Sequence, residues 1–246
     1  MTRPIVLIHG SPGAPNAWKG VVRALGEDTA VITPGLPDHN QPHPPQRRET
    51  AEMAATIADE LGPQPAGIVL AAHSYGGNVA LQMALSDKVK VAALVLVEPV
   101  ALGILPPLGE EKAYGEARAV FDSYIAQAHA GETDAVRTMI EFWFGSGAFA
   151  RMPDPVRGFL RSQTAVNARD VEATFREHHT REKLAALSIP VIVAYGTKSP
   201  AVAKLIAERL AATVKNGKAV PLDGADHGML ATHAPQIAAL IKETAS

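Results

Sequence analysis

The chain has 246 residues, of which 47% are hydrophobic and 20% are charged, a composition typical of a globular protein rather than a disordered or fibrous one. Its net charge of −2 predicts no field that would gather nucleic acid or an anionic membrane. Because it has no cysteine, disulfides and cysteine-bound metals are excluded. We expect neither a signal peptide nor a membrane span, and hence a cytoplasmic protein with a small-molecule substrate.

Short apolar runs alternate along the chain with segments whose apolar residues recur at helical spacing. This alternation predicts an α/β fold with a mostly parallel, doubly wound sheet of about six strands. The strands are expected at Ile5–Ile8, Ala30–Thr33, Ile68–Ala71, Val91–Val97, Val191–Ala194 and Lys218–Leu222. Helices are expected at Ala17–Leu25, Arg48–Leu61, Gly77–Leu85, Ala201–Leu210 and around Ile237–Ile241. The proline-rich stretch Pro34–Pro45 predicts a loop.

The alternation stops between about Ala101 and Leu187, where the patterns are helical throughout. Nine of the twelve aromatic residues lie in this stretch, which supplies large side chains for a small core of its own. We therefore expect a core formed by residues 1–100 and 188–246 and an inserted helical cap over residues 101–187. Most of these aromatic residues are expected to pack within the cap, whereas Phe142, Trp143 and Phe144 are expected to face a substrate pocket.

The segment Ala72-His73-Ser74-Tyr75-Gly76-Gly77 directly follows a predicted strand and precedes a predicted helix. In this context a sharp turn exposes a serine hydroxyl at the carboxyl end of the sheet and requires small neighbours, as in the G-x-S-x-G nucleophile elbow. Ala72 here replaces the first glycine of that motif. The alternative is an ordinary strand-to-helix turn with a surface serine, and the motif alone does not separate the two.

A serine nucleophile needs a base and donors for the oxyanion that forms. His227 is the expected base, because it lies in a glycine-rich loop after the last predicted strand, at the same edge of the sheet as Ser74. The expected oxyanion donors are the backbone N–H groups of Ser11, after the first strand, and of Tyr75. The glycine-rich loop His9–Gly13 lacks the nucleotide-binding signatures, so no such cofactor is expected.

Three motifs occur in an order and at a spacing that resemble one known superfamily: His9-Gly10-Ser11-Pro12-Gly13 followed by Trp18, the Ser74 turn, and Gly224-Ala225-Asp226-His227 before Pro235. The chain resembles the α/β-hydrolase fold superfamily over about residues 4–100 and 188–243. The resemblance implies cofactor-free acyl chemistry by a Ser–acid–His triad. The few residues before the His-Gly loop are similar to the compact branch that lacks the first two strands.

The third member of the triad departs from the family pattern. The usual acid follows the strand at Val191–Ala194 in a motif like Tyr-Gly-x-x-Asp, but here Ser199 occupies that position and cannot ionise. Glu98, which ends the strand Val91–Val97, is the expected replacement, because some family members carry the acid there and a buried carboxylate is costly unless it is paired. Asp223 is the alternative, and a triad without an acid is the third possibility. Substitution of Ser199 by alanine is then expected to have little effect.

These residues predict a cofactor-independent serine hydrolase that acts on a small or medium apolar carboxylic ester through Ser74, His227, Glu98 and an acyl-enzyme. The same residues would serve a cofactor-free lyase, a C–C hydrolase or a thioesterase, because fold and triad do not fix the substrate. The serine at position 199 also suggests a ligand-binding protein of the hydrolase fold. Asp38, His39 and His43 lie at a proline-rich spacing that does not preform a metal site, so no metal is expected.

Overall fold

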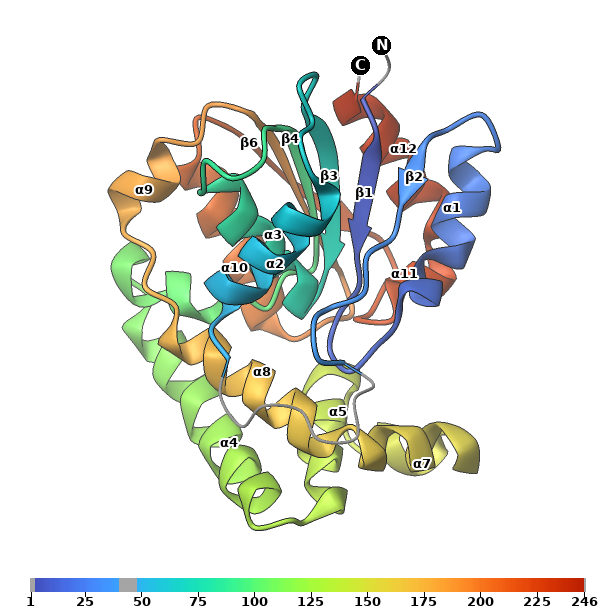
Figure 1. The fold of residues 1–246 in the computed structure, drawn as a ribbon. Coiled ribbons are helices and arrows are strands. Elements are labelled where there is room, and N and C mark those ends of the chain that lie inside the picture. The colour runs from blue at the N-terminus through green and yellow to red at the C-terminus, as the bar shows by residue number, and fades with distance from the viewer. Residues whose placement is uncertain (1–2, 40–47, 246) are drawn as a thin grey trace.

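A computed structural model describes residues 3–39 and 48–245, and in it six parallel strands form one sheet in the order β2-β1-β3-β4-β5-β6 (Figure 1). His43 and part of the predicted loop Pro34–Pro45 lie outside the described residues. The six-stranded parallel sheet expected from the apolar runs is confirmed. Its strands are β1 (Ile5–Ile8), β2 (Val31–Ile32), β3 (Ile68–His73), β4 (Val91–Val97), β5 (Pro190–Gly196) and β6 (Asn216–Leu222).

Helices cover both faces of this sheet, as expected for parallel strands joined by crossovers. One face packs against α2 (Thr50–Leu61), α3 (Tyr75–Ala84) and α10 (Ala201–Thr213). The other face packs against η1 (Pro15–Trp18), α1 (Lys19–Leu25), α11 (Met229–Thr232) and α12 (Ala234–Ala245).

Alternate residues of each central strand enter two separate hydrophobic clusters. In β1, Val6 and Ile8 pack into one cluster, whereas Ile5 and Leu7 pack into the other. β3 repeats this division, with Leu70 in the first cluster. The two clusters follow from the period of two along a strand, and they explain why these strands appear in the sequence as continuous apolar runs.

The described chain between β4 and β5 forms helices and no strand. This stretch, residues 102–185, is called the helical insertion below. Most of it lies beyond the carboxyl ends of the strands, whereas its last helix lies beside the sheet (Figure 1). The boundaries of a separate cap domain stay a prediction. The elements of the insertion are η2 (Leu102–Ile104), η3 (Pro106–Leu108), α4 (Glu111–His129), η4 (Thr133–Ala135), α5 (Val136–Phe144), α6 (Ala148–Arg151), α7 (Asp154–Ser162), α8 (Thr164–Arg176) and α9 (Arg181–Ala185).

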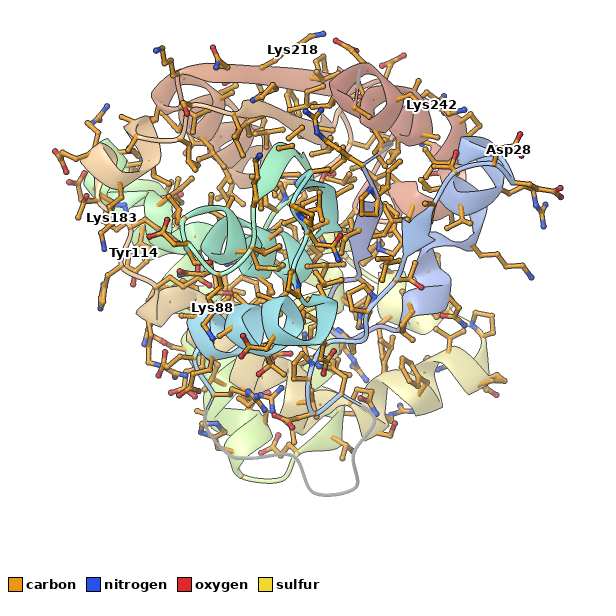
Figure 2. The ribbon with its side chains drawn as sticks, turned by 45° about the horizontal axis from the view of Figure 1, so that its top comes forward. Asp28, Lys88, Tyr114, Lys183, Lys218 and Lys242 are labelled. Carbon is orange, nitrogen blue, oxygen red and sulfur yellow. The ribbon has the colours of Figure 1, made fainter. Side chains whose placement is uncertain are left out.

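Charged side chains gather at the periphery of the molecule. Figure 2 shows Asp28, Lys183, Lys218 and Lys242 at its outer edge, and all four are exposed. Within the described residues, every helix is too short or too polar to cross a lipid bilayer.

Candidate active site

Ser74 lies in a sharp turn between β3 and α3. Its backbone φ of 54° is in a region that residues other than glycine rarely adopt. The turn packs so closely against the loop after β1 that a Cβ atom on Gly76 would lie 2.3 Å from the carbonyl oxygen of His9. A Cβ atom on Gly10 would lie 2.8 Å from that of Ser74. This close approach explains why small residues surround the serine.

His227 lies between Ser74 and Glu98 and contacts both. Its Nε2 atom is 2.9 Å from the Ser74 hydroxyl oxygen, and its Nδ1 atom is 2.8 Å from Oε1 of Glu98. A carboxylate is an acceptor, so the proton of the neutral imidazole lies on Nδ1 and leaves Nε2 free to accept from Ser74. The structure therefore brings the three residues named from the sequence into one hydrogen-bonded chain.

Glu98 is fully buried, with a φ of 45° at the end of β4. Burial alone would raise the pKa of its carboxyl group. Hydrogen bonds and the charge interaction with His227, together with donation from the Gly196 N–H and the Ser199 hydroxyl, outweigh burial and hold this pKa below its ordinary value. Asp223, the alternative acid, instead accepts a hydrogen bond from Thr197.

Ser199 thus supports the acid from the position where the family usually places an aspartate. Its hydroxyl oxygen lies 2.7 Å from Oε2 of Glu98, the oxygen that His227 does not use. The sequence did not predict this contact, and the small effect expected for Ser199→Ala stays a prediction. A serine hydroxyl thus lies beside Glu98 at the position where the family usually has an aspartate.

Two histidines, the buried His9 and the partly buried His73, hold the loops around the site. His73 donates from Nε2 to the backbone carbonyl of His227 at 2.9 Å and so anchors the loop that carries the base. His9 accepts from the Leu36 N–H at 3.1 Å and donates to the Gly10 carbonyl at 2.8 Å. Burial is the largest cause of their low pKa values, about 3 for His73 and about 4 for His9, so both are neutral near pH 7.

The expected oxyanion donors lie on either side of Ser74. Tyr75 begins α3, and Ser11 belongs to the loop after β1. Among the described residues, neither backbone N–H has a hydrogen-bond partner, so both are available to an oxyanion.

Asn167, in α8 of the insertion, holds the Ser11 loop. Its side-chain amide donates to the Ser11 carbonyl at 2.8 Å, and its oxygen accepts from the Tyr124 hydroxyl at 2.7 Å. The sequence does not predict this contact, because a single asparagine in a helical pattern carries no signal of a partner in a loop 156 positions earlier.

The side chains of the three consecutive aromatic residues at the end of α5 point in different directions. The Trp143 ring stacks on His227 with 4.6 Å between ring centroids, and Phe144 meets His227 edge-on at 5.7 Å. Phe142 faces neither of the two cavities beside Ser74 and packs instead on Phe121 and Trp143. Successive helix residues point about 100° apart, so three in a row cannot line one pocket.

The two cavities share Ser11, Ser74 and Met139 but differ in size and in the rest of their lining. The inner cavity has a volume of about 20 Å³ and is lined by Val100, Leu102, Trp143, Asn167, Asp170, Val171 and others. The outer groove has a volume of about 320 Å³ and is lined by His227, Phe144, Ile140, Val156, Leu160, Leu230 and others.

Asp170 at the inner cavity belongs to a buried ionic cluster. Its carboxylate lies 2.9 Å from His39 and 2.9 Å from the Arg169 guanidinium. Asp38 pairs with Arg48 and lies 3.9 Å from Arg169. Two of the residues considered for metal binding therefore join the insertion to the loop after β2. Among the described residues, no group of three or more His, Asp or Glu side chains is arranged to hold a metal ion.

A family model described as the alpha/beta hydrolase family matches residues 5–240. The chain belongs to the alpha/beta hydrolase family. The predicted resemblance to the α/β-hydrolase superfamily is therefore confirmed.

Curated relatives match over shorter stretches. The chain is 35% identical over 103 residues to a dihydrolipoyllysine-residue acetyltransferase component of the acetoin cleaving system from Cupriavidus necator, covering 40% of this chain and 27% of that protein. It is 38% identical over 99 residues to a pimeloyl-[acyl-carrier protein] methyl ester esterase from Aromatoleum aromaticum, covering 39% and 38%. It is 31% identical over 99 residues to a soluble epoxide hydrolase from Corynebacterium, covering 39% and 34%. The chain thus spans about a third of the length of the curated relatives it matches.

Solved structures match the whole fold. MenH from S. aureus superposes with a TM-score of 0.73 at 17% identity, covering 100% of this chain and 96% of that one. A thermophilic esterase from Thermogutta terrifontis gives 0.69 at 24% identity, covering 98% and 88%. At these identities the likeness describes the fold.

Proposed function

We propose that this protein is a cofactor-independent serine hydrolase that cleaves a carboxylic ester through an acyl-enzyme. The observation that carries the proposal is the unbroken hydrogen-bonded chain from the Ser74 hydroxyl through His227 to Glu98, at 2.9 and 2.8 Å. A serine hydroxyl is a weak nucleophile at neutral pH, and this arrangement supplies the base and the group that orients the base.

In the proposed reaction, Ser74 Oγ attacks the ester carbonyl while His227 Nε2 takes the hydroxyl proton. The imidazolium that forms is stabilised by the Glu98 carboxylate and by the face of the Trp143 ring, which lies 4.6 Å away. The N–H groups of Ser11 and Tyr75 bind the oxyanion. His227 then gives its proton to the leaving alcohol, and water hydrolyses the acyl-enzyme by the reverse sequence of proton transfers.

The acid has the properties that this reaction needs. Because hydrogen bonds hold the pKa of Glu98 below its ordinary value, its carboxylate is ionised throughout the neutral range. The backbone N–H of Gly196 and the hydroxyl of Ser199 also fix its orientation. This environment supports Glu98 as a replacement for the aspartate that position 199 lacks.

The relatives include proteins named for ester and for epoxide hydrolysis. The resemblance implies an aspartate nucleophile in epoxide hydrolases, and a serine occupies that position here, which favours ester chemistry. Lyase, C–C hydrolase and thioesterase reactions use the same residues and are the second class of candidates.

The test is hydrolysis of a p-nitrophenyl ester series, from acetate to octanoate, by the wild-type protein and by Ser74→Ala. We expect the substitution to lower kcat by about 10⁴-fold or more, because the nucleophile is lost and only binding and oxyanion stabilisation remain. A fluorophosphonate probe, read by mass spectrometry, should modify Ser74. A folded wild-type protein that the probe does not label would instead support a ligand-binding role.

A further inference from the structure

The two cavities beside Ser74 have very different volumes and would accommodate two parts of a substrate of different size. Every ester has an acyl side and an alcohol side, and both must extend from the carbonyl carbon that Ser74 attacks. The inner cavity, at about 20 Å³, has room for about one water molecule or a group of similar size. The outer groove, at about 320 Å³, accepts a much longer group.

The position of His227 decides which side is which. The base must return its proton to the leaving oxygen, so the alcohol part has to lie beside the imidazole. His227 and the following Gly228 line the outer groove and not the inner cavity. The inner cavity is lined by Ser11, Ser74, Tyr75, Val100 and residues of η2, α4, α5 and α8. The alcohol part therefore occupies the outer groove and the acyl part occupies the inner cavity.

The chemistry of the walls fits this division. The outer groove presents apolar side chains from α5, α7 and α11, and one of them, Val156, is 42% exposed. The inner cavity is lined by Asn167 and Asp170, which are 2% and 1% exposed and contact Ser11, His39 and Arg169. A long chain on the acyl side would have to displace these buried polar groups.

We infer that the preferred substrate class is an ester of a very short acid, such as acetate, with a larger apolar alcohol. The inference rests on the proposed function and adds to it the direction in which the ester binds. It separates this protein from hydrolases that cleave a long acyl chain from a small alcohol.

The direct test compares hexyl acetate with ethyl hexanoate, two isomers of one formula that exchange the long and the short side. We expect kcat/KM for hexyl acetate to exceed that for ethyl hexanoate by about 100-fold, because several methylenes that the groove buries find no room in the inner cavity. Equal rates, or faster hydrolysis of ethyl hexanoate, would overturn the inference. Failure to hydrolyse either isomer in a Ser74-dependent way would count against the proposed function itself.

A matched pair of substitutions locates the restriction. Val171 lines the inner cavity, and Val156 lines the outer groove. We expect Val171→Ala to raise the rate ratio of hexyl butyrate to hexyl acetate by about tenfold, because removing two methyl groups enlarges the acyl side. Val156→Ala should leave that ratio unchanged. If circular dichroism shows both variants folded and they change the ratio equally, or not at all, the inner cavity is not the acyl site.

Discussion

The loops of the sheet and the helical insertion contribute different things to the site. The sheet supplies Ser74, His227 and Glu98, each from a position that follows a parallel strand. The insertion supplies Trp143 from α5 and Asn167 from α8, which form walls and supports. On the proposed reaction, changes to the first group should abolish the chemistry for every ester, whereas changes to the second should adjust its rate or its choice of ester.

The largest effect after loss of the nucleophile is expected for Glu98→Gln. This isosteric change removes the charge that stabilises the His227 imidazolium, and loss of a triad acid lowers kcat by about 10⁴-fold. Steady-state hydrolysis of p-nitrophenyl acetate measures it. Asp223→Asn serves as the control and should retain activity. If Glu98→Gln were active and Asp223→Asn inactive, the acid of the triad would be Asp223 in the loop after β6.

Asn167→Ala tests whether the helical insertion contributes to the catalytic rate in addition to forming walls of the site. Without the amide that donates to the Ser11 carbonyl, the oxyanion loop loses one hydrogen bond, and kcat should fall by about tenfold with little change in KM. Tyr124→Phe removes only the hydroxyl behind Asn167 and should have a smaller effect of the same kind. A change in KM alone would instead make Asn167 a binding residue.

A smaller effect is expected for Ser199→Ala, together with a shift in pH dependence. Loss of this donor should lower kcat by about threefold at pH 7. The hydroxyl is one of the groups that lower the pKa of Glu98, so its removal raises that pKa and moves any acid limb governed by Glu98 to higher pH. A pH–rate profile of both proteins measures the shift. An unchanged kcat and profile would return Ser199 to the dispensable role expected from the sequence.

The smallest effect on activity is expected for His73 and His9, whose low pKa values should instead affect stability measurably. Burial holds the pKa of His73 at about 3 and that of His9 at about 4, against 6.5 for an ordinary histidine. Below pH 6.5 these histidines therefore bind protons in the unfolded chain but stay neutral in the folded protein. Each such proton lowers the unfolding free energy by about 1.4 kcal/mol for every unit by which the pH falls. Urea unfolding between pH 7 and 5 should show this loss. His73→Asn should reduce the slope, and an unchanged slope would contradict the buried neutral state.

Much of the sheet could be predicted because buried parallel strands leave continuous apolar runs in the sequence. Val91–Val97 agrees with β4 at both ends, and the run that predicts Ile68–Ala71 ends two residues before β3 does. The prediction was less precise for the shortest strand, because β2 spans Val31–Ile32 whereas Ala30–Thr33 was expected. Two residues at the edge of a sheet leave a weak pattern.

The three residues of the hydrogen-bonded chain were predictable from their places after strands, whereas the contacts that support them were not. Ser74, Glu98 and His227 meet because the carboxyl ends of parallel strands share one edge. Asn167 and Ser199 contribute through side chains whose partners are 156 and 101 positions away, and no local pattern records such a contact.

Helix α8 is fastened to the sheet loops at several points, with Asn167 on Ser11 and Asp170 on His39. Because this wall is held in place, substrate and products reach and leave Ser74 along the outer groove. On the proposed reaction, the freed alcohol departs along the route by which the ester entered, and water follows into the vacated space. The walls beside Ser74 thus give the departing alcohol and the entering water the same path.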